Sequence, residues 1–294
     1  MDLRHLRYFV AVAEELSFTR AAERLHIAQP PLSQQIQALE QELGLQLFER
    51  TRRRVTLTPA GERFLVDARR ALHAADEAIQ SARRMARGEQ GELRVGFTSS
   101  VPFTGLLPEL LRRYRLAYPQ VTVSLRELFT TEQFAALAER RLDVGLVRND
   151  GLARPAGITL RELRRDPLRL VLPARHPLSD ATAVSLGDVR DEGFIMYPSD
   201  AGTGLGAQVR QLCAAVGFEP RVVQEAREAT TQIGLVAAGL GVAVLPAPLE
   251  CVRMAGVRYV PIDDPAAFVS LALAFMENDS SPLVTNFVAM VKGK

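Results

Sequence analysis

The chain has 294 residues, of which 47% are hydrophobic and 24% are charged, and its formal net charge is +2 at pH 7. This length exceeds one ordinary hydrophobic core, so two or three compact units are expected, and the composition excludes disordered and fibrous classes. A nearly balanced charge points to no partner by itself, because strong attraction to a polyanion needs a large excess of positive charge.

The sequence shows no sign of export or membrane insertion. Its first ten residues, MDLRHLRYFV, carry charges every few positions, unlike a secretory signal. The most apolar stretch, residues 233–249, is interrupted by glycines and a proline and falls short of the roughly 20 residues that span a bilayer. We therefore expect a cytoplasmic protein without a membrane partner, in which Cys213 and Cys251 are buried free thiols.

Three segments with helical periodicity fill the first 45 residues. Ser17 is a good N-cap for the second segment, and Pro30 and Pro31 suit the first turn of the third, where their missing N–H groups would have been unpaired. Gly44 is a good helix end. The apolar positions that define the helices are Leu3, Leu6, Val10 and Ala13, then Phe18, Ala21, Ala22 and Leu25, then Leu32, Ile36, Leu39 and Leu43.

The third helix has an unusual exposed face. It carries Gln29, Ser33, Gln34 and Gln37, where a solvent-facing helix usually carries Lys and Glu. Short uncharged hydrogen-bonding groups suit a surface that fits against another molecule. Two short helices separated by a tight turn, the second with such a face, predict a helix-turn-helix.

Residues 44–59, GLQLFERTRRRVTLTP, follow this helix. An apolar start, an arginine-rich tip and alternating apolar residues after the tip predict a β-hairpin wing. The tip holds the densest basic cluster of the chain, Arg50, Arg52, Arg53 and Arg54, which on its own is equally compatible with a solvated loop.

A long helix is predicted after the wing. Thr58 is a good N-cap, Pro59 a good first residue, and Glu62 lies in the first turn. Apolar residues then step by three and four in a heptad seam, which predicts a dimer helix, while the alternative is a helix that packs on its own domain. The seam consists of Leu65, Ala68, Leu72, Ala75, Ile79, Ala82 and Ala86, and RGEQGE at 87–92 predicts a hinge.

After residue 92 strand-like and helical segments alternate, which predicts largely parallel sheets with helices on both faces. A charged break at 161–166 and a turn at 263–265 are the expected borders between two lobes. The expected strands are 93–97, 121–128, 143–147, 168–172, 194–198, 221–226, 241–246 and 269–275.

The sequence contains no nucleophile elbow, no H-E-x-x-H and no P-loop, so we expect no enzyme activity, no metal site and no cofactor. One motif keeps a rival function open. Residues 202–207, GTGLGA, satisfy G-x-G-x-x-A between a strand and a helix, as in dinucleotide-binding oxidoreductases. The same turn could instead present N–H groups and a positive helix dipole to any anion.

Polar side chains follow the first three strands of this region. Ser99 and Ser100 come after the first strand, Thr130 after the second and Arg148 after the third, and Thr203 could close the site from the second lobe. Because the carboxyl ends of parallel strands meet at one edge, these groups are expected to form one effector site for a small carboxylate. The alternative is that the hydroxyls cap helices and Arg148 pairs with the aspartate two positions later.

The stretch LRYFVAVAEELSFTRAAERLHIAQPPLSQQIQALEQELGLQLFERTRRRVTLTPAGERF resembles the LysR-type transcriptional regulators, with a near-continuous likeness over residues 2–64. The remaining chain is similar in organisation. TTEQFAALAERRLDVGLVR resembles the branch of the family that senses aromatic-degradation intermediates. The resemblance implies a cleft effector site and a recognition helix in the major groove.

Carried over to this chain, the resemblance places Gln29, Pro30, Ser33 and Gln34 against DNA and Arg52 and Arg53 on the wing. The sequence departs from the common family pattern with Ala28 and Pro31, where Ser and Ala are frequent. The missing serine removes a helix cap or a backbone contact, and the second proline can compensate by fixing the first turn.

The expected fold is an N-terminal winged helix-turn-helix with a long linker helix, followed by a C-terminal α/β effector domain with two lobes, like a periplasmic binding protein. The expected borders are 1–58 for the DNA-binding domain, 59–91 for the linker, and 92–294 for the effector domain, with lobe I at 92–162 and 266–294 and lobe II at 163–265.

The resemblance implies a transcriptional regulator that binds an interrupted inverted repeat of double-stranded DNA as a homodimer or homotetramer. It also implies contact with RNA polymerase and control by a small organic-acid effector. Two other functions are compatible with parts of the sequence. A solute-binding protein shares the α/β half but needs a signal peptide, and an oxidoreductase would use the 202–207 loop.

Overall fold

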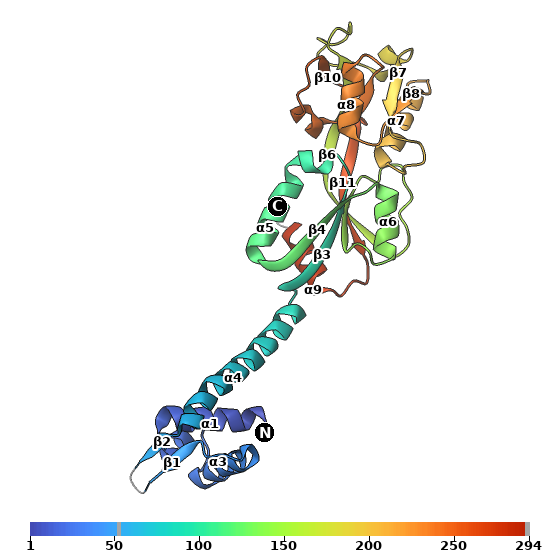
Figure 1. The fold of residues 1–294 in the computed structure, drawn as a ribbon. Coiled ribbons are helices and arrows are strands. Elements are labelled where there is room, and N and C mark those ends of the chain that lie inside the picture. Colours follow the sequence, from blue (N-terminus) through green and yellow to red (C-terminus); the bar gives the residue numbers. More distant parts are fainter. Residues whose placement is uncertain (52–53, 292–294) are drawn as a thin grey trace. The chain divides into compact units, whose positions relative to one another are not determined.

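The computed structural model describes residues 1–51 and 54–291 of the chain. It divides into two compact units, Met1–Arg84 and Met85–Lys294. The elements of both are labelled in Figure 1, and each unit is described by itself. No helix within the described residues is long and apolar enough to cross a membrane.

The first unit is helical with a two-stranded wing, as the sequence predicts. Strands β1 and β2 are antiparallel, with Phe48 opposite Leu57 and Arg50 opposite Val55. Its elements are α1 (Leu3–Glu15), α2 (Phe18–Arg24), α3 (Gln29–Leu43), β1 (Phe48–Arg50), β2 (Val55–Leu57) and α4 (Pro59–Ala86). The core contains Leu6, Phe9, Val12, Leu32, Ile36, Leu39, Leu47 and Phe48, all almost fully buried.

The predicted helix ends are confirmed. The Ser17 hydroxyl accepts a hydrogen bond from the Arg20 N–H, and Gly44 takes the left-handed conformation at φ +70° after α3. The Thr58 hydroxyl accepts from the Gly61 N–H at 3.0 Å at the start of α4. Ala28 caps α3 without any side-chain hydrogen bond, so this helix begins on its prolines instead.

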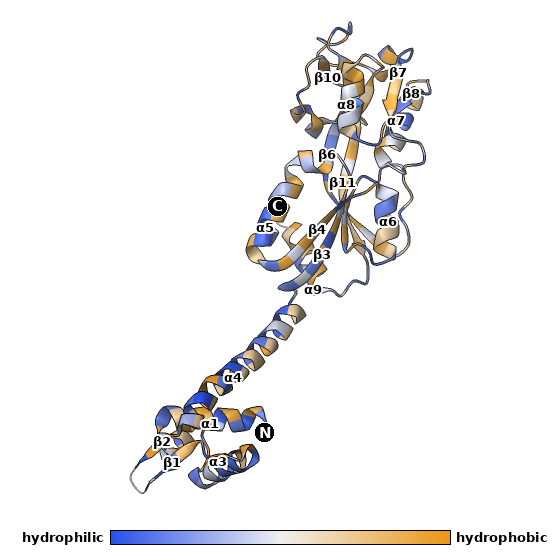
Figure 2. Cartoon of the chain, in the orientation of Figure 1, coloured by the Kyte–Doolittle hydropathy of each residue, from blue (hydrophilic) through white to orange (hydrophobic). Residues whose placement is uncertain are grey.

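The prediction that the whole seam of α4 faces a partner helix is wrong for its first half. Leu65, Ala68 and Leu72 pack against the core of the first unit, because these turns of α4 lie beside α1. The rings of Phe9 and Phe64 are 5.0 Å apart there. Figure 2 shows α4 alternating between hydrophilic and hydrophobic residues along its length, and further along Ile79 is 45% exposed.

The second unit repeats one strand–helix order in two lobes, each with its own core. The first lobe contains β3 (Gln90–Phe97), η1 (Val101–Thr104), α5 (Leu106–Ala117), β4 (Gln120–Glu127), α6 (Thr130–Ala138), β5 (Val144–Val147) and the C-terminal α9 (Pro282–Val291). The second contains η2 (Leu186–Val189), β7 (Gly193–Met196), α7 (Gly204–Ala215), β8 (Arg221–Glu225), α8 (Ala229–Ala237), β9 (Ala243–Pro246), η3 (Ala247–Cys251) and β10 (Val257–Pro261).

Two long strands, β6 (Ile158–Pro173) and β11 (Phe268–Met276), run antiparallel through both lobes. The described residues form a seven-stranded sheet in the order β10-β6-β11-β5-β3-β4, with β9 also on β6, and β7 pairs with β8 separately. The expectation of largely parallel sheets is therefore wrong. Only β3–β4, β3–β5 and β7–β8 are parallel among the described strand pairs, because β6 and β11 return against the others.

Every expected strand is present, but residues 161–166 are not a break. They lie inside β6, where Arg161 pairs with Leu273 and Asp166 with Val269. In this part Glu162, Arg164 and Arg165 are exposed, whereas Asp166 is buried. Strand β10 was not expected.

Cys213 is a buried free thiol as predicted, whereas Cys251 is exposed, against the prediction.

Candidate functional site

The exposed face of α3 is the candidate DNA-reading surface. Leu32, Ile36 and Leu39 point into the core with no exposed area, which turns the opposite side of the helix outward. Gln29, Pro30 and Gln34 are exposed there, and Ser33 is half-buried. Gln29, Pro30 and Gln34 thus lie on the exposed surface of one helix, and Ser33 lies at its border with the buried side.

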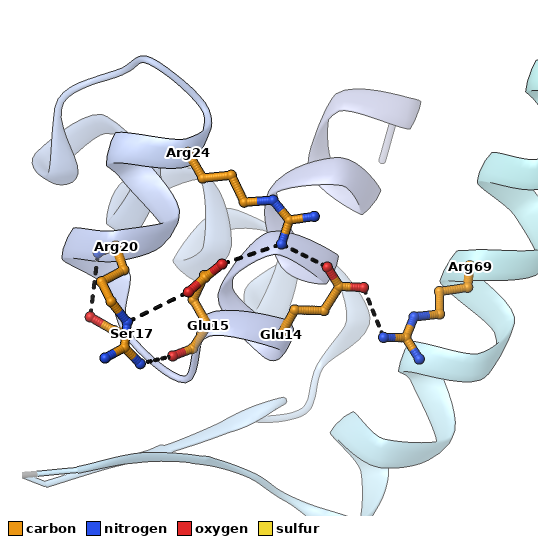
Figure 3. Close-up of polar contacts among 6 residues, drawn as sticks. All are labelled: Glu14, Glu15, Ser17, Arg20, Arg24 and Arg69. Atoms are coloured by element: carbon orange, nitrogen blue, oxygen red, sulfur yellow. Dashed lines mark hydrogen bonds and ion pairs between the residues drawn. The ribbon is translucent and has the colours of Figure 1, made fainter.

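Figure 3 shows the ion pairs that fix the helices around this surface. Glu14 on α1 binds Arg24 of α2 and Arg69 of α4, with both N–O distances at 2.8 Å. Hydrogen bonds from Arg69 and then Arg24 lower the pKa of Glu14. Arg20 contacts both the carboxylate and the backbone carbonyl of Glu15. These pairs are partly exposed, so each contributes at most about 1 kcal/mol, but together they fix α2 and α4 on α1.

The wing is attached to α3 by a residue that sequence reasoning missed. Glu40 is only 3% exposed. Its Oε1 accepts from the N–H groups of Leu47 at 2.9 Å and Phe48 at 3.1 Å, and its Oε2 accepts from Arg50 Nη2 at 2.7 Å. A glutamate next to Leu39 on an otherwise apolar helix stripe was the available signal. The predicted wing contacts Arg52 and Arg53 lie outside the described residues.

A pocket between the two lobes brings together all five predicted effector residues. Ser99, Ser100, Thr130 and Arg148 come from the first lobe and Thr203 from the second. The pocket has a free volume of about 20 Å³, room for about one water molecule, and is also lined by Thr98, Phe129, Tyr197 and Leu205. The five residues therefore lie together as expected, and their contact with an effector stays a prediction.

Arg148 does not offer a free charge to this pocket, as the expected carboxylate site implies, because it is already paired within the protein. Its side chain is buried and its Nη2 lies 2.7 Å from a carboxylate oxygen of Asp166, which has no exposed area. Its Nε donates to Ser100 Oγ at 2.8 Å, and Arg164 approaches the other oxygen of Asp166 at 2.6 Å. Burial lowers the pKa of Arg148, and Asp166 opposes this shift. The predicted alternative, pairing with Asp150, is also wrong, because Asp166 is the partner.

The other predicted side chains already make hydrogen bonds within the protein. The Thr130 hydroxyl donates to the Arg148 carbonyl at 2.9 Å, and Thr203 Oγ1 accepts from the Gly206 N–H at 3.1 Å as the cap of α7. Ser99 Oγ lies 3.3 Å from the Tyr197 hydroxyl across the lobes. Burial raises the pKa of Tyr197 to about 12, so its hydroxyl stays protonated.

One hydroxyl in the pocket makes no hydrogen bond within the described residues. Thr98 Oγ1 is buried and has no hydrogen-bond partner among the described residues. A buried polar atom without a partner is unfavourable, so it favours a ligand that supplies one. Sequence reasoning passed over Thr98, although it directly precedes Ser99 at the end of β3.

The glycine-rich loop at 202–207 has a structural explanation. The Gly204 N–H donates to the Arg148 carbonyl of the other lobe at 3.1 Å, and a Cβ at this position would lie 2.3 Å from that oxygen. Gly202 has φ +60°, and a Cβ there would lie 2.2 Å from Thr131 Oγ1. These glycines allow the two lobes to approach each other, which leaves the dinucleotide reading without support.

A second pocket beside the first carries carboxylates from both lobes. Glu127 and Glu132 of the first lobe and Glu228 of the second line a pocket that shares Ser99 and Phe129 with the first pocket. Burial, and then the neighbouring Glu228, raise the pKa of Glu127 to about 7. None of these three glutamates was expected at the site, because nothing in the sequence pairs residues of the two lobes.

Comparisons with known proteins agree over the whole chain. Residues 3–62 match the bacterial regulatory helix-turn-helix proteins of the lysR family, and residues 86–294 match the LysR substrate binding domain. The Escherichia coli protein YnfL, described as an uncharacterized HTH-type transcriptional regulator, is 46% identical over 288 residues, or 98% of this chain and 96% of YnfL.

Two solved structures are similar as well. Full-length CbnR complexed with its target DNA has a TM-score of 0.84 and 33% identity, covering 99% of this chain and 98% of CbnR. The BenM effector binding domain with its effector benzoate has a TM-score of 0.60 and 31% identity, covering 68% of this chain and 90% of that domain. The relatives are regulators rather than enzymes. The chain belongs to the LysR family of DNA-binding transcriptional regulators, with a helix-turn-helix domain and an effector-binding domain.

Proposed function

We propose that the protein binds an interrupted inverted repeat of double-stranded DNA as a homodimer or homotetramer and responds to a small organic acid bound between its lobes. The effector would shift the population of lobe arrangements and so alter contact with RNA polymerase. The division into DNA-binding, linker and effector segments at 1–58, 59–91 and 92–294 belongs to this proposal.

The DNA contacts are assigned to the exposed face of α3 and to the wing. Gln29, Ser33 and Gln34 can hydrogen-bond base edges and phosphates, and Pro30 sets the start of the helix. Arg52 and Arg53 would contact the backbone from the wing. An uncharged exposed face opposite a fully buried apolar stripe supports this assignment.

The effector is assigned to the pocket lined by both lobes, and this pocket is the observation that carries the proposal. Hydroxyls of Thr98, Ser99 and Thr203 surround it, and the N-terminus of α7 adds a positive dipole that suits a carboxylate. Arg148 supplies positive charge at its wall while it remains paired with Asp166. Benzoate, which the BenM domain binds, is the natural first probe.

Self-association is assigned to the apolar surface of α4 and to the free edge of the sheet. Ile79 is 45% exposed, Leu125 on the edge strand β4 is 46% exposed, and Leu116 on α5 is 70% exposed. Exposed apolar residues of this size on a helix and an open strand edge favour a second copy of the chain as their cover.

The first test selects binding sites from a pool of random duplexes with the full-length protein. We expect enrichment of one interrupted inverted repeat, because two identical reading heads impose two-fold symmetry on the site. Recovery of unrelated sequences without symmetry would contradict the proposal for DNA.

The second test is a thermal-shift screen with benzoate and other aromatic and dicarboxylic acids, because a ligand of the native state raises its melting temperature. Thr98→Val removes the unpartnered hydroxyl with little change in volume. It should raise the melting temperature of the free protein slightly and reduce the shift given by an active acid. Thr122→Val, an exposed residue of β4 outside the pocket, is the matched control. An equal shift in all three proteins would remove Thr98 from the site.

A further inference from the structure

Glu40 is a charged group in a place that normally holds an apolar one. It lies on the inner side of the reading helix α3, one turn beyond Ile36 and next to Leu39, both without exposed area. All three of its hydrogen bonds go to one short segment, the N–H groups of Leu47 and Phe48 and the guanidinium of Arg50. A carboxylate this deeply buried persists only when such bonds replace its water.

Arg50 faces the protein, unlike the exposed Arg54 of the same wing cluster. Its Nη2 lies 2.7 Å from Glu40, and its guanidinium carbon lies 4.9 Å from the centre of the Phe18 ring on α2. Its Nε is buried without a hydrogen-bond partner in the described part of the chain. The guanidinium is thus held between a carboxylate of α3 and an aromatic face of α2.

The two ends of the wing are also joined to each other where the chain enters α4. The Thr58 N–H donates to the Leu47 carbonyl at 3.0 Å, and the Thr58 hydroxyl donates to the Gln46 carbonyl at 2.8 Å. A Cβ on Gly61 would lie 2.1 Å from the Leu47 oxygen, so the start of α4 presses directly on this segment. The base of the wing is therefore clamped between α4 and Glu40.

We propose that Glu40 and Arg50 are positioning residues that hold the wing at a fixed place beside the reading helix, so that both meet DNA together. Neither side chain touches DNA. The carboxylate ties the backbone of β1 to α3, and the guanidinium ties the end of β1 to α2. This inference rests on the proposed wing contacts with the DNA backbone.

The charges of the two residues make the idea testable. If they acted only through their charge near a polyanion, Glu40→Gln would strengthen DNA binding and Arg50→Met would weaken it. If they position the wing, both changes break the same ion pair and both weaken binding. Gln at position 40 can still accept from the backbone N–H groups, and Met at position 50 can still cover Phe18, so both variants should fold.

The experiment measures affinity of the full-length protein for a random-sequence 40-base-pair duplex by fluorescence anisotropy at several salt concentrations. We expect Glu40→Gln and Arg50→Met each to weaken binding on the order of tenfold and to reduce the salt slope by about one unit for each lost phosphate contact. The double variant should equal either single one. Glu49→Gln, an exposed change of the same charge on β1, is the control and should bind slightly more tightly.

Arg53→Ala separates the two possible failures. If it leaves affinity and salt slope unchanged, the proposed wing contact fails, and the inference fails with it. If Arg53→Ala weakens binding while Glu40→Gln behaves like Glu49→Gln, the wing contacts DNA but Glu40 does not position it. Arg50→Met leaves the buried Glu40 carboxylate with only its two backbone bonds, so its melting temperature should fall. Binding is therefore measured at a temperature well below the melting temperature of every variant, so that an observed loss arises in the wing and not from unfolding.

Discussion

Replacing Arg148 by Met should destabilise the effector domain, because it leaves the carboxylate of Asp166 buried. Removal of one partner of a buried ion pair costs about 3–5 kcal/mol. Arg164 still approaches Asp166 at 2.6 Å and offsets part of that cost, so we expect a loss of about 2–3 kcal/mol in the free energy of unfolding. Arg164→Met is the matched control. That side chain is 41% exposed and Arg148 stays in place, so the loss should remain below about 1 kcal/mol.

Urea unfolding followed by tyrosine fluorescence measures this effect. The chain has no tryptophan and five tyrosines, and four of them (Tyr114, Tyr118, Tyr197 and Tyr259) lie in the second unit, so the signal reports mainly on that unit. The urea concentration at the midpoint of unfolding should fall, with little change in the dependence of the free energy of unfolding on urea concentration. A loss no larger than that of the Arg164 variant would refute the view that Arg148 serves mainly to neutralise Asp166.

Four further results are expected. Gln34→Ala should weaken binding to the selected repeat by about 1–3 kcal/mol but change binding to random DNA little, as gel shifts will show. Ile79→Glu should shift the oligomer toward monomers in sedimentation, because this side chain is 45% exposed, whereas the first half of the seam packs on the core of its own unit. Gly204→Ala should reduce the response to an active acid, because its Cβ would lie 2.3 Å from a carbonyl oxygen of the other lobe. The raised pKa of Glu127, about 7, means that the folded state binds a proton that the unfolded state releases above about pH 4.5. Melting temperature should therefore fall as the pH rises from 5 to 8, and Glu127→Gln or Glu228→Gln should flatten that dependence.

The helix-turn-helix half was predictable because its signals are local. Caps such as Ser17 and Thr58, the prolines of α3 and the helix end at Gly44 each act within one turn of the residue that carries them. The role of Glu40 was not predictable, because its contacts are not local. Its partners lie seven to ten residues away on another element, and only the folded chain shows that a glutamate on the apolar stripe is satisfied.

In the effector domain, the residues that line the pocket were predictable, but the ion pair between Arg148 and Asp166 was not. Alternation of strands and polar strand ends identified the pocket residues, because the ends of β3, β4 and β5 meet at one edge whatever the rest of the sheet does. The charged run at 161–166 was taken for a break, although it is the part of β6 that carries Asp166 to Arg148. Sequence patterns show which residues end a strand. Which partner Arg148 finds depends on β6, which runs back antiparallel and brings Asp166 beside it.

The glycines at 202–207 illustrate why a motif needs its surroundings. In a dinucleotide site, glycine is required because a phosphate approaches the backbone. Here the atom that approaches Gly204 is the Arg148 carbonyl oxygen, and the atoms that approach Gly202 belong to Thr131. Both neighbours lie in the other lobe, so these glycines set how closely the lobes can meet. The same hydrogen bond, from the Gly204 N–H to the Arg148 carbonyl, joins the lobe that carries Thr203 to the strand end that carries Arg148. Any ligand that moves the lobes apart or together must change this contact, which makes the loop part of the proposed response rather than a cofactor site.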